Sequence, residues 1–375
     1  MSDLALYVHW PFCVSKCPYC DFNSHVRGSI DQDAWRGALL ADLAHEANLL
    51  PGRRLTSIFF GGGTPSLMDP RTVEAIISAA RSHWATADNV EITLEANPNS
   101  AEADRFADLA AAGVNRISLG LQNFDDGALA FLGRAHSAAE GQRALAAAQS
   151  AVGRVTFDLI YALPGDDEQR WSRDLDRALG LGTEHLSLYQ LTIEPGTRFA
   201  SMVARRDFDP LDNDTAATLF EMTQERTGAA GMPAYEISNH ARPGAESRHN
   251  LTYWRYGDYA GIGPGAHGRR TGMRTVRHKK PENFLSAIAR NGHGLMEEEV
   301  LPPADAAKEA LVMGLRLAEG IDLNALESRF QRPIVDDHAT DRLIGHGLLN
   351  RDGPRLATTP AGRLLLDSIL AEIAA

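Results

Sequence analysis

Short apolar runs recur along the N-terminal half of the chain and alternate with segments whose apolar residues follow helical spacing. The short runs predict strands at Ala5–His9, Thr56–Phe60, Val90–Glu95, Arg116–Leu119, Val155–Ile160 and His185–Leu191. The segments between them predict helices at Trp35–Leu50, Arg71–Trp84, Ala101–Ala111, Ser137–Ala151 and Trp171–Leu181. Six strand–helix units indicate a parallel sheet with right-handed crossovers. Because a closed barrel of this kind needs eight units, we expect an open, partial (β/α)6 barrel.

The alternation fades after Asp212. A helix at Asp212–Ala230 leads into the segment HNLTYW and a Gly-rich basic stretch, and from Pro302 the pattern is helical. The chain ends in a helix, a turn-centred hairpin and a final helix, an order similar to that of a winged helix. We therefore predict a C-terminal α+β extension and a small winged-helix-like helical domain. The expected division is 1–235 (partial barrel), 236–300 (linking region with HNLTYW) and 301–375 (winged-helix-like domain).

Composition and charge narrow the function classes. The 375 residues are 44% hydrophobic and 23% charged, which excludes a disordered, collagenous or disulfide-scaffold protein. The 37 basic and 49 acidic residues give a net charge of −12, which disfavours non-specific nucleic-acid binding. The winged-helix-like end carries few basic residues, so we favour a structural or partner-docking role for it. The N-terminus has no signal-peptide pattern and no apolar run approaches the ~20 residues of a membrane span, so we expect a cytoplasmic protein.

The cysteines, Cys13, Cys17 and Cys20, form a C-x3-C-x2-C pattern within eight residues. Their odd number argues against a disulfide framework. Structural zinc prefers four ligands, so a zinc site needs a neighbouring His9 or His25 to complete it. A four-iron cluster on three thiolates instead leaves one iron open to a substrate or cofactor. Three buried, unligated cysteines are the least favoured interpretation.

The pattern C-x3-C-x2-C, with Tyr19 before the third cysteine, resembles the signature of radical S-adenosylmethionine (SAM) proteins. The resemblance implies that Cys13, Cys17 and Cys20 hold a [4Fe–4S] cluster whose fourth iron is chelated by SAM. Reduction of such a low-potential cluster lets an electron cleave the sulfonium to a 5′-deoxyadenosyl radical.

A glycine run, Gly61-Gly62-Gly63-Thr64-Pro65-Ser66, follows the second predicted strand. Glycines let the backbone approach a ligand closely, although a lone run of this kind is more often a tight βα turn. Similar GGGTP segments in radical SAM proteins contact the methionine amino group. The resemblance assigns that role to Gly62, Gly63 and Thr64.

Polar residues are predicted at four successive strand ends: Glu95, Gln122, Arg134 and Asp158. Taken singly, such residues serve equally well as caps. Together they resemble the oxygen-independent coproporphyrinogen III oxidases and their relatives, over essentially the whole chain. In that family the matching Glu, Gln, Arg and Asp line the SAM sites, and aromatics matching Tyr7 and Tyr19 lie beside the cluster and adenine.

Two departures separate this chain from the true oxidases. Phe22 stands where those enzymes have a further cysteine, and their N-terminal extension is missing. In both respects the chain resembles the shorter sister group, the haem chaperones of the HemW type, whose characteristic motif is H-N-x-x-Y-W. Here that motif is His249 to Trp254. His249 has the chemistry of an axial iron ligand, and Tyr253 and Trp254 offer flat faces to a porphyrin, although a hydrogen-bonded His beside core aromatics is the ordinary alternative.

A basic run free of acids follows the motif at 268–280, with Arg269, Arg270, Arg274, Arg277, Lys279 and Lys280. Arginine binds carboxylates in a bidentate manner, so the run suits haem propionates. It equally suits a docking partner, an anionic lipid or a solvated hairpin.

The resemblance implies a haem chaperone that passes haem to acceptor proteins such as respiratory enzymes of the membrane, with SAM, a [4Fe–4S] cluster and an electron donor. A coproporphyrinogen III oxidase is the alternative, and a nucleic-acid-modifying radical enzyme is a third. We expect no nucleic-acid partner. Peripheral membrane contact and oligomeric state stay open.

Overall fold

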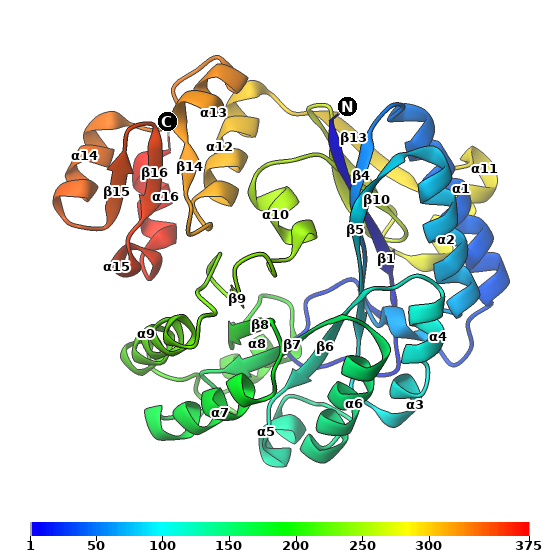
Figure 1. The fold of residues 1–375 in the computed structure, drawn as a ribbon, viewed down its shortest axis with the longest axis horizontal. Helices are drawn as coiled ribbons and strands as arrows, with labels where there is room; N and C mark the ends of the chain where they lie inside the picture. Colours follow the sequence, from blue (N-terminus) through cyan, green and yellow to red (C-terminus); the bar gives the residue numbers. More distant parts are fainter. Residues whose placement is uncertain (1, 375) are drawn as a thin grey trace.

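The computed structural model describes residues 2–374, and most of its strands join one mixed sheet. The sheet has eleven strands in the order β13-β12-β11-β10-β1-β4-β5-β6-β7-β8-β9. Six parallel strands form its centre: β1 (Asp3–Trp10), β4 (Arg54–Gly62), β5 (Ala85–Ala96), β6 (Arg116–Gln122), β7 (Arg154–Tyr161) and β8 (His185–Gln190). These are the six predicted strands, and the barrel they form is open (Figure 1).

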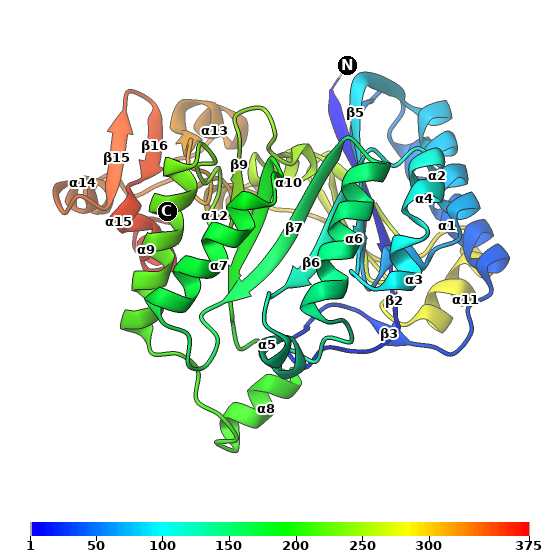
Figure 2. The same ribbon diagram turned by 60° about the horizontal axis from the view of Figure 1, so that its bottom comes forward.

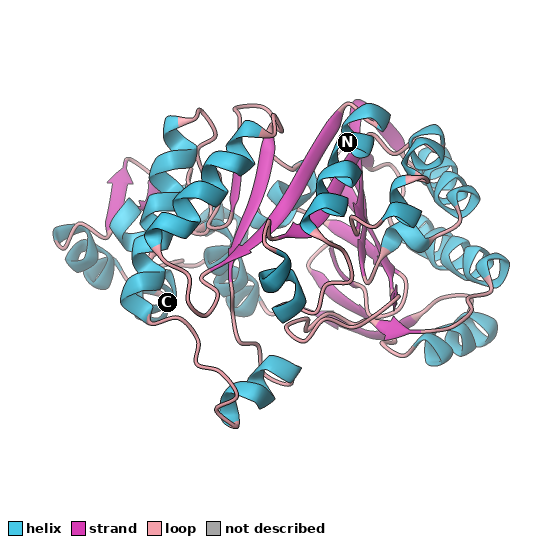
Figure 3. Cartoon of the chain, turned by 90° about the horizontal axis from the view of Figure 1, so that it is seen from below, coloured by secondary structure: helices cyan, strands magenta, loops and turns pink. Residues whose placement is uncertain are grey.

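Helices cover the outer face of the curved sheet (Figure 3). They are α1 (Gln32–Leu49), α2 (Pro70–His83), α3 (Ser100–Ala103), α4 (Phe106–Ala111), α6 (Ala138–Ala151) and α7 (Glu168–Gly180). Local sequence fixes their starts: Asp69 caps α2 ahead of a proline at the first helical position, and Ser137 and Glu140 form a capping box on α6. The single helix predicted at Ala101–Ala111 is divided into α3 and α4, and Phe106 and Leu109 of α4 are buried in the core.

The second half of the chain extends the sheet at both edges. On the β1 side, β10 (Tyr259–Ile262) pairs parallel with β1, followed by antiparallel β11 (His267–Arg270), β12 (Met273–Arg277) and β13 (Leu295–Val300). On the other side, β9 (Asn239–Ala241) pairs antiparallel with β8. The glutamates of β13 are exposed at the sheet edge, where charge discourages pairing with another chain.

The remaining elements connect the strands or lie beside their carboxyl ends. They are β2 (Phe12–Cys13), β3 (His25–Val26), η1 (Pro65–Leu67), α5 (Asp126–Phe131), α8 (Arg198–Ala204), α9 (Asn213–Ala229), α10 (Arg248–Trp254) and α11 (Pro281–Asn291). Figure 2 shows β2, β3, α5 and α8 at one end of the barrel. Within residues 2–374, no helix has both the length and the apolar character needed to cross a bilayer.

The C-terminal elements have a hydrophobic core of their own. They are α12 (Pro303–Gly314), β14 (Ile321–Asp322), α13 (Leu323–Phe330), α14 (Asp337–Gly345), β15 (Leu349–Asp352), β16 (Arg355–Thr358), α15 (Pro360–Arg363) and α16 (Leu366–Ile373). A three-stranded sheet, β14-β16-β15, packs against the helices around Leu311, Leu343, Leu356 and Ile369. Helices followed by a hairpin and a last helix give the predicted winged-helix-like order.

Candidate functional site

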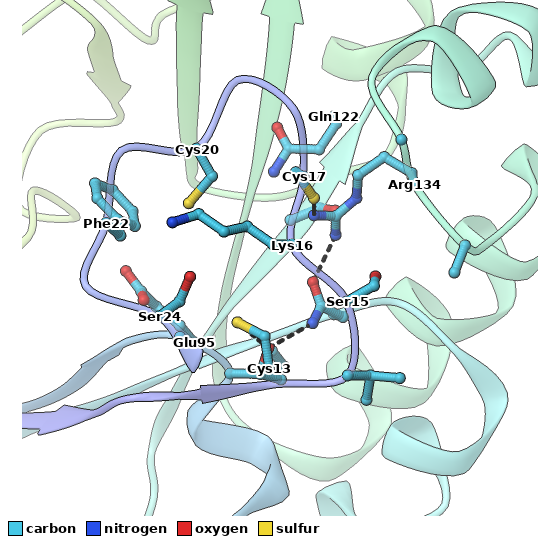
Figure 4. A pocket seen from close by; sticks show the side chains of 18 of the residues that line it. Cys13, Ser15, Lys16, Cys17, Cys20, Phe22, Ser24, Glu95, Gln122 and Arg134 are labelled. Carbon is cyan, nitrogen blue, oxygen red and sulfur yellow. Dashed lines mark hydrogen bonds between the residues drawn. The ribbon is translucent and has the colours of Figure 1, made fainter. Parts of the chain in front are cut away.

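The three cysteines lie on a loop at the carboxyl edge of the parallel sheet. Both ends of this loop are held together, because β2 pairs with β3 through Cys13 and Val26. In the middle, the carbonyl of Pro18 accepts a hydrogen bond from the backbone of Phe199 at 2.9 Å, which ties the loop to α8. All three thiols are free and line one cavity of about 200 Å³ (Figure 4).

The same cavity collects almost all of the residues that the sequence singles out for SAM. Its lining includes Tyr19, Gly62, Gly63, Thr64, Glu95, Gln122, Arg134 and Asp158. Tyr7 instead lines a wider neighbouring cavity, together with Gly62, Glu95 and Asp158, which belong to both. His249 lines neither cavity. Residues from four separate strands and three loops therefore meet around the thiols.

The glycine turn after β4 has no room for side chains. A Cβ atom on Gly63 would lie 2.6 Å from the carbonyl oxygen of Phe12, and one on Gly62 would lie 2.5 Å from the ring of His9. Gly62 also has φ = +112°, which L side chains rarely adopt. Its N–H donates to Glu95 Oε2 at 3.1 Å, and the next hydroxyl, of Thr64, donates to Cys13 Sγ at 3.5 Å. The turn thus brings bare backbone against the cysteine loop.

Arg134 connects the cysteine loop to the strand ends. Its guanidinium donates to Cys17 Sγ at 3.5 Å, to Asn97 Oδ1 at 2.5 Å and to the carbonyl of Gly120 at 3.0 Å, while its buried Nε has no partner among the described residues. Gln122, beside it in Figure 4, has φ = +66°, an uncommon conformation for a residue with a side chain. Such strain is concentrated at functional sites.

Two carboxyl groups lie in the wall that the cavities share. Burial, reinforced by the nearby Asp158, raises the pKa of Glu95 to about 8. Burial likewise raises the pKa of Asp158 to about 6. Hydrogen bonds from Ser187 and Ser118 and the charges of Arg116 and Arg134 act in the opposite direction and lower this pKa. Burial also raises the pKa of the Cys13 and Cys20 thiols. A bound cation or metal cluster offsets each of these costs, because it favours the ionised forms.

Two of the polar residues differ in position from the sequence-based expectation of strand ends. Asp158 lies inside β7, three residues before its last residue, in register with Ser187 of β8. Arg134 lies in the loop after α5. The inward alternation of β7 brings Asp158 into the cavity, so it is a residue of the barrel interior.

The wider cavity has a volume of about 800 Å³ and adjoins the cysteine cavity through shared wall residues. One side is aromatic, with Tyr7, Phe59, Tyr253, Trp254 and Tyr259. Four imidazoles also line it, those of His9, His25, His185 and His267, together with the cations Lys16, Lys279 and Arg116. Tyr259 of β10 and His267 of β11 had no signal in the sequence, because β10 joins the sheet through pairing with the distant β1.

His249 is fully buried behind this aromatic wall. Its ring stacks on Phe59 at 4.8 Å between centroids and meets Tyr253 edge-on at 5.3 Å. Nδ1 lies 3.1 Å from the hydroxyl of Ser57, and Nε2 has no partner among the described residues. Burial lowers the pKa of His249 to about 3, so the imidazole is neutral at pH 7. Tyr253 and Trp254 of the same motif do line the wide cavity.

Most of the basic run is engaged within the protein. Arg270 and Arg277 are buried and paired with Glu46 of α1 at 2.9 and 2.5 Å. Arg269 stacks over Tyr256, and Arg274 pairs with Glu299 on the surface. Lys279 and Lys280 are exposed, and of the six only Lys279 lines the wide cavity. The run therefore serves mainly to attach the sheet extension.

The family comparisons agree with this geometry. The radical SAM superfamily matches residues 7–178, and the HemN C-terminal domain matches residues 301–365. The heme chaperone HemW of Escherichia coli (strain K12) is 39% identical over 99% of this chain and 98% of its own length. The chain belongs to the HemW family of radical SAM proteins.

Other HemW relatives span a wide range of organisms. The heme chaperone HemW of Mycobacterium tuberculosis is 36% identical over 98% of this chain and 94% of its own length. The mitochondrial radical S-adenosyl methionine domain-containing protein 1 of Mus musculus is 39% identical over 98% of this chain and 86% of its own length. The solved coproporphyrinogen III oxidase (HemN) from Escherichia coli superposes with a TM-score of 0.82 at 23% identity, covering 99% of this chain and 89% of that one, so the two share a fold.

Radical SAM membership implies a [4Fe–4S] cluster and SAM, and the residues present fit both. The donor set is three free thiols on one short loop facing one cavity. Beside them lie a glycine turn that a Cβ atom would obstruct and the orphaned, buried Nε of Arg134. Within the described part of the chain, no three His, Cys, Asp or Glu side chains are grouped to hold a single metal ion.

Proposed function

We propose that this HemW-family protein binds haem in the wide cavity and passes it to acceptor proteins, with a [4Fe–4S] cluster and SAM in the adjoining cavity. The observation that carries the proposal is the aromatic cavity of about 800 Å³ next to the cysteine loop. Ligand pockets span about 300–1,000 Å³ and combine apolar walls with a few polar groups. The relatives of this chain include proteins named heme chaperone HemW, a name that agrees with this proposal.

Within the smaller cavity, we propose that Cys13, Cys17 and Cys20 hold the cluster. When bound, the cluster and SAM supply one-electron chemistry at the sulfonium. Backbone groups of the Gly62–Thr64 turn bind the amino acid part of SAM, since side chains are excluded there. The polar groups of Glu95, Gln122, Arg134 and Asp158, with the rings of Tyr7 and Tyr19, complete the SAM site.

In the wide cavity, the flat faces of Tyr253 and Trp254 suit a porphyrin, and Lys16 and Lys279 suit its propionates. The HNLTYW motif predicts His249 as an iron ligand, but its ring lies outside the lining of this cavity. To reach a haem in this cavity, its imidazole needs to leave the stack with Phe59. The acceptors we propose are haem proteins such as respiratory enzymes, served from the cytoplasm, with a separate electron donor.

Oxidation of coproporphyrinogen III is the second candidate, and the shared fold with HemN favours it. Phe22, where the oxidases have a further cysteine, argues against it, and so do the 36–39% identical heme chaperones HemW. One sample separates the two: protein reconstituted anaerobically with iron, sulfide and SAM. We expect stoichiometric binding of hemin in an absorbance titration and no protoporphyrinogen IX from coproporphyrinogen III. Conversion at enzymatic rates would replace the chaperone proposal with the oxidase.

A further inference from the structure

An imidazole can ligate a haem iron only if one ring nitrogen has a lone pair that no hydrogen bond occupies. Four histidines, His9, His25, His185 and His267, line the wide cavity where we propose that haem binds. They come from distant parts of the chain and differ in how their ring nitrogens are used. Their hydrogen bonds therefore discriminate among them.

Both ring nitrogens are engaged in the two buried histidines. His9 has Nδ1 at 2.9 Å from the hydroxyl of Tyr7 and Nε2 at 2.9 Å from the carbonyl of Asn23. His185 has Nδ1 at 2.7 Å from the hydroxyl of Thr156 and Nε2 at 2.9 Å from that of Tyr235. Ligation by either ring would break a pair of buried hydrogen bonds, which is costly.

His25 is half-buried and also engaged. Its Nε2 lies 3.3 Å from Oδ1 of Asn23, a hydrogen bond that holds the ring in place. Asn23 in turn donates to the carbonyls of Pro264 and Lys279, both at 2.9 Å. The ring of His25 is thus part of a network that closes one end of the cavity.

His267 is different. It is the first residue of β11, its side chain is exposed in the cavity wall, and no hydrogen bond from the described residues reaches its ring. Partial burial, with the charges of Lys279 and Arg274, lowers its pKa, so the ring is neutral at pH 7 and keeps a lone pair. Lys279 lines the same cavity and is close enough to act on this ring, which puts a cation within reach of a propionate.

We propose that His267 supplies the axial imidazole to the haem iron, beside Lys279 as a partner for a propionate. This assignment rests on the proposed haem-binding function and names the ligand within it. It differs from ligation by His249, whose ring lies behind the wall, stacked on Phe59, and outside the cavity lining. His267 needs no repacking of the core to reach iron.

The test is hemin binding by the full-length reconstituted protein, read by ferric EPR and by Soret difference spectra. His267→Ala should weaken hemin affinity roughly tenfold or more and remove the EPR signal of histidine-ligated haem, because a coordinate bond is lost. Added imidazole should restore that signal by filling the space left by the side chain. His25→Ala is the matched control in the same cavity and should keep the wild-type EPR signal.

The outcomes separate this inference from the function on which it rests. If the wild-type protein binds no hemin, the proposed function fails and the ligand assignment fails with it. If the wild type binds hemin and His267→Ala keeps its affinity and EPR signal, only the assignment to His267 is overturned. A loss of signal in His249→Ala alone would give the ligand role to the motif histidine. A loss in His267→Ala that imidazole does not restore would exclude His267 as the ligand.

Discussion

Around the cysteine loop, single residues are constrained by atoms that come from distant segments of the chain. Gly63 is packed against the backbone of Phe12, and Gly62 against the ring of His9. Thr64 donates to Cys13, and Arg134 donates to Cys17. Each of these contacts orients a group toward the cavity, so we expect site substitutions to alter binding more than overall folding.

Cys17→Ala should prevent formation of the [4Fe–4S] cluster. The loop then offers two thiolates, and Arg134 loses its sulfur acceptor. Iron and sulfide analysis after anaerobic reconstitution, with the absorbance of the cluster, measures the result. Ser15→Ala is the control, because Ser15 lies on the same loop and lines the same cavity without a thiol. Full iron and sulfide content in Cys17→Ala would contradict the cluster assignment.

Glu95→Gln should make the protein without cluster or SAM more stable, and increasingly so as the pH rises. The pKa of Glu95 is about 8 in the folded protein against 4.5 ordinarily, so between these values the folded state binds more protons than the unfolded state. Stability contributed by the protonated group is therefore lost as the pH rises through this window, by an amount on the order of a few kcal/mol. The amide side chain of the Glu95→Gln variant does not titrate, so its contribution to stability does not change with pH.

Chemical denaturation of both proteins at pH 5 and pH 8 measures this effect. The difference in unfolding free energy should be small at pH 5 and should favour Glu95→Gln at pH 8. Asp69→Asn is a useful contrast, because Arg71 lowers the pKa of that carboxyl, which is therefore ionised at both pH values, so its substitution should give no difference between pH 5 and pH 8. An equal difference between wild type and Glu95→Gln at both pH values would contradict the raised pKa.

At the scale of elements, the β10–β13 extension depends on buried ion pairs with α1. Asp42 and Glu46 of α1 are fully buried and face Arg270 and Arg277. Asp42 also accepts hydrogen bonds from the backbone N–H groups of Gly263 and Gly294. Buried charges are tolerated only when paired, so these acids and arginines hold the extension against the helix that covers the barrel.

Arg277→Met should lower the free energy of unfolding by about 3–5 kcal/mol, because it leaves the buried Asp42 without a charged partner and Glu46 with Arg270 alone. Urea denaturation followed by circular dichroism measures the change. Arg274→Ala is the matched control on the same strand, since its pair with Glu299 is exposed and should contribute no more than about 1 kcal/mol. Equal effects of the two substitutions would show that the buried pairs do not stabilise the extension.

At the scale of the whole molecule, the C-terminal elements pack on the segment that forms the wall of the wide cavity. Arg316 lies 4.6 Å from the ring of Trp254 and pairs with the buried Glu236 at 3.3 Å. Tyr256 donates to Glu309 at 2.9 Å, and Arg255 pairs with Glu319 at 2.8 Å. The C-terminal elements thus pack beside α10 (Figure 1).

Arg316→Ala should lower stability by about 1–3 kcal/mol, because Glu236 stays buried and loses a charged donor. It should also expose Trp254, which a red shift in tryptophan emission would report. Arg342→Ala removes an exposed pair with Glu372 inside the C-terminal region and should change stability by about 1 kcal/mol at most. An unchanged emission spectrum in Arg316→Ala would count against this docking role.

The sequence by itself determined the six strand–helix units and the position of the cysteine loop. Both follow from local patterns, namely apolar periodicity and the spacing of Cys13, Cys17 and Cys20. The carboxyl ends of parallel strands lie on one edge of the sheet, so order along the chain was enough to bring Gly62, Glu95 and the thiols to one cavity. The missed break between α3 and α4 is a local error of the same method.

Only the tertiary structure decided the wide cavity and what surrounds it. Two arginines of the basic run, Arg270 and Arg277, pair with Glu46, more than 200 positions away on α1, and Lys279 is left in the cavity wall. The burial of His249 and the open ring of His267 likewise depend on which strands become neighbours. Contacts between segments so far apart leave no periodic signal in the sequence, because the residues that make them are chosen to fit the distant partner and not their own neighbours along the chain. The physical reason is that the energy of strand pairing is gained only when these distant segments lie side by side in the folded sheet.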